Sequence, residues 1–268
     1  MNKRPYDIVY PNPVPAGVKL RKNVYATMRD SIRIALDIYK PAEGKGPWPL
    51  ILAYSSFAKE RLFESAKPGY YCKQGYVCVQ AAERGVGLSQ GRFTFQGPQA
   101  AEDGYDIIEW LAGQPWCNGN VAMMGASGYG VMQWMTAILN PPHLKALVVL
   151  GTTDNYRGLC YPGGVLRKPF VLSMVSGMIM GAIWPGPVDG KEAPSDVING
   201  ILTHTEDDTY WQGHGSTWKD IHKIKVPALN IVQAPNRLHA TYHLRSYNDL
   251  KSTKKLIKIG RASCRERV

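Results

Sequence analysis

The sequence has 268 residues, of which 44% are hydrophobic and 20% charged, a balance typical of a globular protein. No run of about 18 apolar residues occurs, and no apolar stretch follows the basic N-terminus, so we expect neither a membrane-spanning helix nor a secretory signal. Five cysteines without metal-type spacing indicate reduced thiols and a cytoplasmic protein. The net charge of +11 gathers near the two ends and does not alternate with aromatic residues, so we expect no nucleic-acid partner.

The first predicted elements are a hairpin and two buried strands. Residues 23–40 alternate between apolar and polar side chains on both sides of Arg29-Asp30-Ser31, which indicates two strands joined by a turn. Residues 50–56 form the continuous apolar run of a strand that is buried on both faces. Residues 64–75 are partly helical and end at Gly75, and residues 76–83 form the next buried strand.

Helices and strands alternate in the following part of the chain. Residues 99–114 predict a helix with an apolar face, residues 120–126 a strand, residues 128–139 a helix and residues 144–152 a strand. Because this alternation requires parallel strands joined by helical crossovers, the sequence predicts an α/β protein. We expect a mostly parallel sheet with helices on both faces.

The alternation stops after residue 152, and this divides the chain. Residues 1–152 are predicted to be the first part of the core, and residues 153–222, rich in Gly, Pro, Met and Trp, a helical cap inserted over the sheet edge. Residues 223–258 resume the core with a strand at 225–232, a helix at 241–251 and a strand at 254–259. Residues 259–268, "IGRASCRERV", look like a translated sequencing adapter, and we expect them to be non-native.

Ser127 stands between a predicted strand and a predicted helix, in Gly125-Ala126-Ser127-Gly128. This approaches the G-x-S-x-G turn, in which a strained backbone lifts a nucleophilic serine above the sheet. The N–H of Gly128 would then face a developing oxyanion at the positive end of the helix. Tyr129 departs from the pattern, because the glycine comes one residue later. The stretch alone therefore leaves two interpretations open, a nucleophile or a plain turn.

Several further segments, taken in order, resemble the Xaa-Pro dipeptidyl-peptidase and cocaine-esterase-like family of α/β-hydrolases. They are residues 28–41, 82–93, 100–127, 140–148 and 210–231. The resemblance implies an α/β-hydrolase fold with a helical cap and a Ser-Asp-His triad. It implies cleavage of amide or ester bonds in a small-molecule or peptide substrate through an acyl-enzyme, without a cofactor or metal. The resemblance also implies a β-rich C-terminal domain, which we expect to be absent from these 268 residues.

The resemblance assigns roles to particular residues. The nucleophile of the family falls on Ser127, with the N–H of Gly128 as an oxyanion donor. The tyrosine that completes the oxyanion site in the family corresponds to Phe57, which has no hydroxyl. The place of the triad acid is taken by Asn236, a neutral amide that can orient a histidine but cannot stabilise its cation.

The resemblance also implies a substrate pocket beneath the cap, lined by Tyr129, Tyr161 and Trp184. The family places its catalytic histidine just after the last predicted strand, where the adapter-like segment begins. We therefore expect the chain to be truncated before its base and to be inactive as it stands.

The histidines within the chain have simpler interpretations than catalysis or metal binding. We expect each to be a solvated or hydrogen-bonded surface residue; they include His204, His214, His222, His239 and His243. In the Gly-rich segment 84–91, which lacks a phosphate-binding lysine, Arg84 is expected to pair with a carboxylate. Glu102 and Asp103 are expected to face the positive end of the next helix.

Two functions remain open at this point. The first is a serine hydrolase of the peptidase or esterase class. The second is a non-catalytic binding or assembly module that keeps the hydrolase sheet, which Phe57, Tyr129 and Asn236 favour. A homo-oligomer is compatible with either, and no membrane partner is expected.

Overall fold

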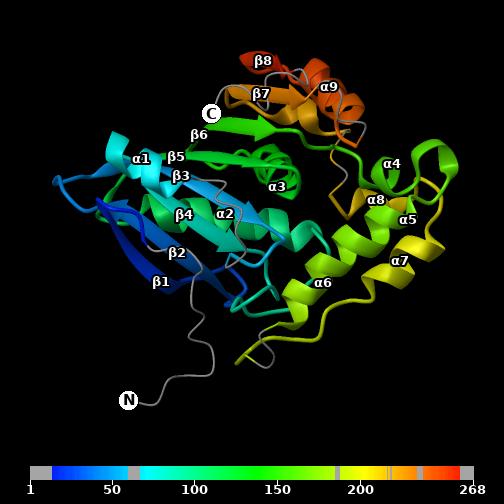
Figure 1. The fold of residues 1–268 in the computed structure, drawn as a ribbon, viewed down its shortest axis with the longest axis horizontal. Helices are drawn as coiled ribbons and strands as arrows, with labels where there is room; N and C mark the ends of the chain where they lie inside the picture. Colours follow the sequence, from blue (N-terminus) through cyan, green and yellow to red (C-terminus); the bar gives the residue numbers. More distant parts are fainter. Residues whose placement is uncertain are drawn as a thin grey trace.

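The computed structural model describes residues 14–59, 67–184, 188–215, 217, 219–233 and 238–259. Within these ranges, eight strands form one sheet in the order β1-β2-β4-β3-β5-β6-β7-β8 (Figure 1). β1 pairs with β2 and β2 with β4 in antiparallel fashion, and every later pair is parallel. The strands are β1 (Val18–Thr27), β2 (Arg33–Pro41), β3 (Trp48–Ser55), β4 (Val77–Ala82), β5 (Cys117–Ala126), β6 (Leu144–Leu150), β7 (Ala228–Gln233) and β8 (Lys254–Ile259).

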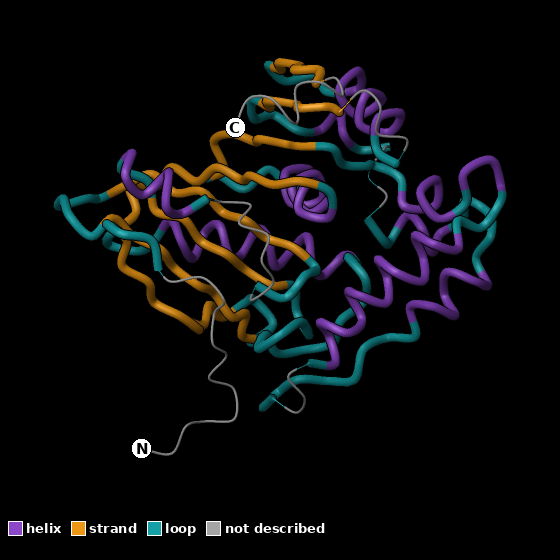
Figure 2. Tube along the Cα trace, in the orientation of Figure 1, coloured by secondary structure: helices purple, strands orange, loops and turns teal. Residues whose placement is uncertain are grey.

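The crossover helices lie on two faces of this sheet. α1 (Pro68–Tyr71) leads from β3 to β4, whereas α2 (Pro98–Ala112) returns from β4 to β5 on the other side of β3. Because such crossovers are right-handed, a reversal of direction places α1 and α2 on opposite faces. The same rule puts α3 (Gly128–Ile138) and α9 (Ala240–Asp249) on the face of α2, and α2 packs directly on α3 (Figure 2).

The predicted α/β architecture is confirmed, and the apolar pattern explains it. β3 and β4 are buried along almost their whole length, as expected of central parallel strands. The apolar face of α2 contributes Ile107, Ile108 and Leu111, and α3 contributes Trp134; all four side chains are fully buried. The core therefore lies between the sheet and the helices of this face.

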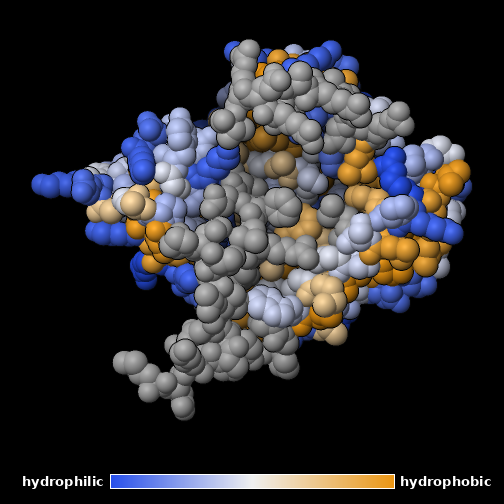
Figure 3. All heavy atoms as spheres, in the orientation of Figure 1, coloured by the Kyte–Doolittle hydropathy of each residue, from blue (hydrophilic) through white to orange (hydrophobic). Residues whose placement is uncertain are grey.

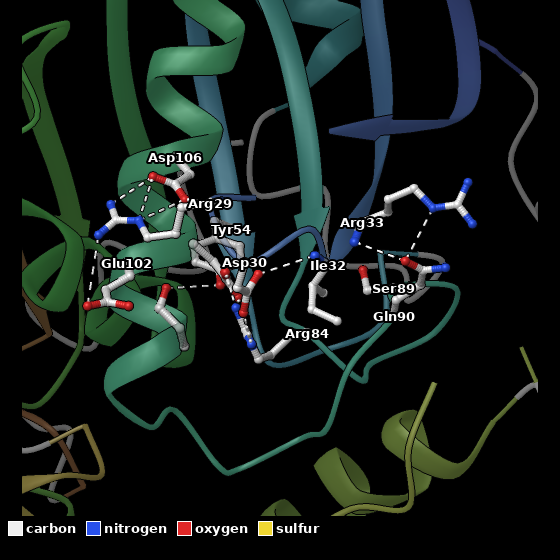
Figure 4. Close-up of polar contacts among 12 residues, drawn as sticks. Arg29, Asp30, Ile32, Arg33, Tyr54, Arg84, Ser89, Gln90, Glu102 and Asp106 are labelled. Carbon is white, nitrogen blue, oxygen red and sulfur yellow. Dashed lines mark hydrogen bonds and ion pairs between the residues drawn. The ribbon is translucent and has the colours of Figure 1, made fainter. Parts of the chain in front are cut away.

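Arg84 joins three parts of the fold, and the expected pairing with a carboxylate is confirmed. Its Nε and Nη2 donate to Asp103 of α2, with the Nε–Oδ2 distance 2.7 Å, and its Nη1 donates to Asp30 in the β1–β2 turn at 2.8 Å (Figure 4). The expectation for Asp103 was wrong, because this side chain is buried and paired instead of facing the start of α2. Burial, as the larger effect, raises the pKa of Asp103, and Arg84 lowers it.

The segment between β6 and β7 is largely helical and lies beyond the carboxyl ends of the parallel strands (Figure 1). Several of its large apolar side chains are exposed, and Figure 3 shows apolar surface gathered over these helices. They are Val165, Leu172, Met180, Ile183, Trp184 and Leu202. The helices of this segment are α4 (Tyr156–Cys160), α5 (Lys168–Phe170) with the π-helical turn η3 (Val171–Val175), α6 (Ser176–Ile183), α7 (Val197–Thr203) and α8 (Thr209–Gln212). Its short 3₁₀ turns are η2 (Pro162–Gly164) and η4 (Ile221–Lys223). A further 3₁₀ turn, η1 (Cys72–Gln74), follows α1 elsewhere in the fold.

Candidate active site

The candidate site lies where the parallel strands end. β3, β4, β5 and β6 run in the same direction, so the residues that follow them meet at one edge of the sheet. Phe57 follows β3, Glu83 follows β4, Ser127 follows β5 and Thr152 follows β6. Ligands of open α/β sheets bind at this carboxyl edge.

Ser127 occupies a sharp turn between β5 and α3. Its backbone angles are φ 57° and ψ −120°, values that a residue with a side chain rarely adopts. Its N–H donates to the carbonyls of Leu150 and Gly151, both at 3.1 Å, which fixes the turn to the end of β6. The residue is half-buried. A strained backbone of this kind persists only where its surroundings hold it, and it is concentrated at functional sites.

Two glycines make this turn possible. A Cβ at Gly125 would lie 2.4 Å from the Cβ of Tyr129, and a Cβ at Gly130 would lie 2.5 Å from the Cβ of Thr152. Tyr129 therefore packs beneath the turn, and it is Gly130 that lets α3 approach β6. The departure from G-x-S-x-G leaves the strained conformation of Ser127 in place.

The first peptide groups of α3 are oriented by Thr152. Its Oγ1 donates to the carbonyl of Ser127 at 2.8 Å. Since a peptide group is planar and trans, fixing this carbonyl also fixes the direction of the Gly128 N–H. Gly128 is the first residue of α3, where amides have no intrahelical acceptor and the helix dipole is positive. This end of α3 can therefore receive a negatively charged oxygen.

Phe57 lies directly against this helix terminus. A Cβ on Gly128 would be 3.2 Å from the Phe57 Cε2 atom, and the Phe57 and Tyr129 rings have centroids 6.4 Å apart. The N–H of Phe57 donates to the Ser55 hydroxyl at 3.0 Å. Phe57 thus stands beside the oxyanion end of α3, where its ring offers no hydrogen bond.

Lys59, two residues further on, anchors the same loop in the interior. Its ammonium group lies 3.0 Å from the Asp37 carboxylate and donates to the Asn23 side-chain oxygen at 2.6 Å. Both Lys59 and Asp37 are almost completely buried. A buried pair of this kind is costly to break, because the partner left behind is an uncompensated charge. The loop that holds Phe57 is therefore fastened to the β1–β2 hairpin.

Glu83 is a buried acid at the same edge that the sequence did not reveal. Its Oε1 accepts from the Gln96 N–H at 3.0 Å. Burial raises the pKa of Glu83 to about 8, against smaller lowering effects of the Ser56 hydroxyl and the Gln96 amide. Gln96 in turn donates through Nε2 to the carbonyl of Gly128 at 3.4 Å. The sequence shows only that Glu83 follows a buried strand. Ordinary loop residues occupy the same kind of position, so this does not predict a buried acid.

The structure brings only part of the predicted site together. Ser127, Gly128, Phe57 and Tyr129 are neighbours, but Tyr161 lies inside the helical segment with its hydroxyl donating to the Ile201 carbonyl. Trp184 is partly exposed at the end of α6. Asn236 and the adapter-like residues after Ile259 lie outside the described residues. Met178 of α6 approaches Gly128 and was not predicted.

Two histidines are not the surface residues that the sequence suggested. His239 and His243, at the start of α9, are buried, and burial lowers the pKa of each to about 4. His243 lies between the Thr152 N–H, 3.4 Å from Nδ1, and the Asn230 side-chain oxygen, 3.1 Å from Nε2. It therefore supports the end of β6 from the interior.

Among the described residues, no group of three or more His, Cys, Asp or Glu side chains is arranged to hold a metal ion. None of the described helices has the length and apolar character needed to cross a bilayer. A cavity of about 400 Å³ lies between α1 and the strands β3, β5 and β6, and its described lining includes none of the candidate site residues.

The sheet order, the two-sided helices and the strained serine between β5 and α3 define the class as an α/β-hydrolase. The chain belongs to the X-Pro dipeptidyl-peptidase (S15) family, whose model matches residues 30–262. This is a family of esterases and peptidases, as the resemblance read from the sequence implied.

Individual relatives agree with this assignment. The cocaine esterase of Rhodococcus sp. is 35% identical over 165 residues, which are 59% of this chain and 28% of the esterase. A CocE/NonD family hydrolase from Staphylococcus aureus is 26% identical with a TM-score of 0.80, over 89% of this chain and 45% of the hydrolase. An α-amino acid ester hydrolase, at 19% identity and a TM-score of 0.64 over 95% and 49% of the two chains, shares the fold. The chain thus spans less than half the length of these relatives.

Proposed function

We propose that this chain is the nucleophile-bearing part of a serine hydrolase that cleaves an amide or ester bond through an acyl-enzyme. The observation that carries the proposal is the strained conformation of Ser127, φ 57° and ψ −120°, at the carboxyl edge of the sheet. A plain turn between a strand and a helix does not need this strain. The relatives, an esterase and a hydrolase, support the same class of reaction.

In this proposal the Ser127 hydroxyl attacks the carbonyl carbon of the substrate, and its proton passes to a histidine base. The negative oxygen of the tetrahedral intermediate is bound by the Gly128 N–H, helped by the dipole of α3. The proton is then delivered to the leaving amine or alcohol, which departs and leaves the acyl-enzyme. Water repeats the attack and releases the acid.

The other parts of the machinery are also proposals. Asn236 holds the position that orients the base, and the base itself is a histidine in polypeptide that follows β8. Support for the second point is the length of the relatives, since this chain covers 28% of the Rhodococcus esterase and 45% of the Staphylococcus hydrolase. Within the described residues His239 and His243 are buried with lowered pKa values, so neither is a good candidate for the base.

The direct test is covalent labelling with a fluorophosphonate, using a protein extended beyond β8 to the length of the relatives. We expect labelling of Ser127 and its complete loss in Ser127→Ala. Ser173→Ala is the matched control, because Ser173 lies on the exposed surface of the helical segment and should leave labelling unchanged. A correctly folded protein that never labels would favour the alternative, a non-catalytic binding or assembly module.

A further inference from the structure

The turn formed by Phe95 and Gln96 has an unusual backbone. Both residues have positive φ, 59° and 54°, although neither is a glycine, and both side chains are buried. A left-handed backbone is unfavourable for residues with long or aromatic side chains, and it persists only where neighbouring contacts hold it. The contacts of this turn therefore identify the parts of the protein that stabilise its conformation.

The first contact is with the nucleophile turn. Gln96 Nε2 donates to the carbonyl of Gly128 at 3.4 Å, and it would lie 3.5 Å from a Cβ on that residue. Thr152 holds the carbonyl of Ser127, and Gln96 holds the next carbonyl along the chain. The two side chains together fix the first two peptide planes of α3.

The second contact is with the buried acid. The Gln96 N–H donates to Glu83 Oε1 at 3.0 Å, and the N–H of Glu83 donates to the carbonyl of Ser55 at 2.9 Å. Glu83 thus connects the Phe95–Gln96 turn to the end of β3, just before Phe57. The mechanism proposed above uses neither Glu83 nor Gln96.

The third contact is with the helical segment. The N–H of Gly215, after α8, donates to the carbonyl of Gln96 at 3.0 Å. The Phe95 ring stacks on the His214 ring with centroids 6.5 Å apart. Gly215 has φ +62°, and a Cβ there would lie 2.5 Å from the Tyr156 ring and 3.0 Å from Gln96 Oε1. The positive φ and the Tyr156 ring require a glycine at this position, and the glycine lies close to Gln96.

We propose that Gln96, held in its left-handed conformation by Glu83, is a positioning residue that couples the helical segment at Gly215 to the first turn of α3. When the segment around Gly215 is in place, the Gln96 side chain holds the Gly128 carbonyl and stabilises the oxyanion end of the helix. When that segment moves away, the hydrogen bond from the Gln96 side chain to the Gly128 carbonyl is weakened. The functional part of this inference rests on the proposed hydrolase activity, but the coupling does not.

The coupling is tested by hydrogen–deuterium exchange of the Gly130 and Val131 amides, which both donate to the Ser127 carbonyl and report opening of the turn. The variant is Gln96→Asn. Asparagine tolerates a positive φ and keeps both backbone hydrogen bonds, but its shorter side chain withdraws from Gly128. We expect exchange at these two amides to rise on the order of tenfold, as for loss of one buried hydrogen bond. Gln90→Asn, earlier in the loop between β4 and α2, shortens a side chain that contacts Arg33 and Asp189 instead, so this matched control should leave the exchange unchanged.

The link to the helical segment is tested with Gly215→Ala and with the double variant. We expect Gly215→Ala to raise exchange at the same two amides, and the double variant to add little to Gln96→Asn, because both changes act through one contact. Glu83→Ala should act like Gln96→Asn, whereas Glu83→Gln should restore slow exchange, since its amide oxygen can still accept from the Gln96 N–H. Where Glu83→Ala does not fold, Gln96→Asn decides the matter.

Unchanged exchange at Gly130 and Val131 in Gln96→Asn, or fully additive effects of the two changes, would overturn the inference. Fluorophosphonate labelling of the same proteins separates it from the proposed function. We expect Gln96→Asn to slow labelling of Ser127 on the order of tenfold. If the unaltered protein does not label at all but the exchange results hold, the proposed activity fails and the coupling stands.

Discussion

At the scale of single residues, the geometry of the candidate site depends on two glycines, which have no side chain. The strained conformation of Ser127 exists because Gly125 and Gly130 bring Tyr129 and Thr152 to distances that a Cβ would prevent. Tyr129 occupies the place where the family pattern has a small residue, yet it fits beneath the turn. The space left by Gly125 therefore decides the geometry more than the residue after Gly128 does.

Replacing Gly125 with alanine should destabilise the protein by about 1–3 kcal/mol through steric overlap with Tyr129. Urea unfolding measures the free energy. Gly75→Ala is the control for backbone strain alone, since Gly75 has φ +80° with no atom near its absent Cβ, and it should cost on the order of 1 kcal/mol. Equal losses in the two variants would mean that the contact with Tyr129 is not close in solution.

At the scale of elements, one buried arginine holds the loop after β4 in position. Arg84 bridges the β1–β2 turn and α2, and its partner Asp103 is almost completely buried. The same loop continues into the Phe95–Gln96 turn that contacts the nucleophile region. The position of α2 against the hairpin and the shape of the site therefore depend on the same ion pair.

Asp103→Ala should destabilise the protein by about 3–5 kcal/mol, because it leaves the Arg84 guanidinium buried without its main counter-charge. Glu102→Ala, the neighbouring residue with half of its side chain exposed, should change the free energy of unfolding by no more than about 0.5 kcal/mol. Chemical denaturation of both variants tests the difference. A loss below about 1 kcal/mol in Asp103→Ala would show that Arg84 finds other partners or water.

The sequence predicts a feature well when neighbouring residues in the chain determine it, and poorly when distant elements do. The strands, the helices and the hairpin follow from periodicity and turn residues, and the turn at Ser127 follows from Gly125 and the adjoining apolar run. The burial of Glu83, Asp103 and His243 has no such signal. A charged residue after a strand reads as a loop residue, and only the packing of distant elements around it makes it an interior group.

At the scale of the whole molecule, buried titratable groups give the free energy of unfolding a defined dependence on pH. The pKa of His243 is lowered to about 4 from an ordinary value of 6.5, so the unfolded chain takes up this proton first as the pH falls. Its contribution to stability is therefore lost between about pH 6.5 and 4. Glu83 acts in the opposite direction, because its pKa is raised to about 8 from 4.5. Its contribution is present below pH 4.5 and is lost as the pH rises to about 8.

The variant Glu83→Gln isolates the second effect. We expect the melting temperature of the unaltered protein to fall from pH 5 to pH 8 by more than that of Glu83→Gln, whose neutral amide cannot ionise. The charge of Asp103 raises the pKa of Glu83 and that of Arg84 lowers it; both residues are unchanged in the variant, so their effects on the rest of the protein cancel in the comparison. If the melting temperatures of the two proteins change with pH in the same way across this range, Glu83 is ionised at neutral pH in the folded protein.

The buried pair of Lys59 and Asp37 limits how the protein can be shortened. Asp37 lies in the middle of β2, in the outer hairpin, and Lys59 lies in the loop after β3, beside the nucleophile. A chain that begins at β3 would leave the Lys59 ammonium group, close to Phe57 in the sequence, without its counter-charge. A smaller version that keeps a working serine must therefore retain the hairpin, or replace Lys59 with an apolar side chain of similar length such as methionine.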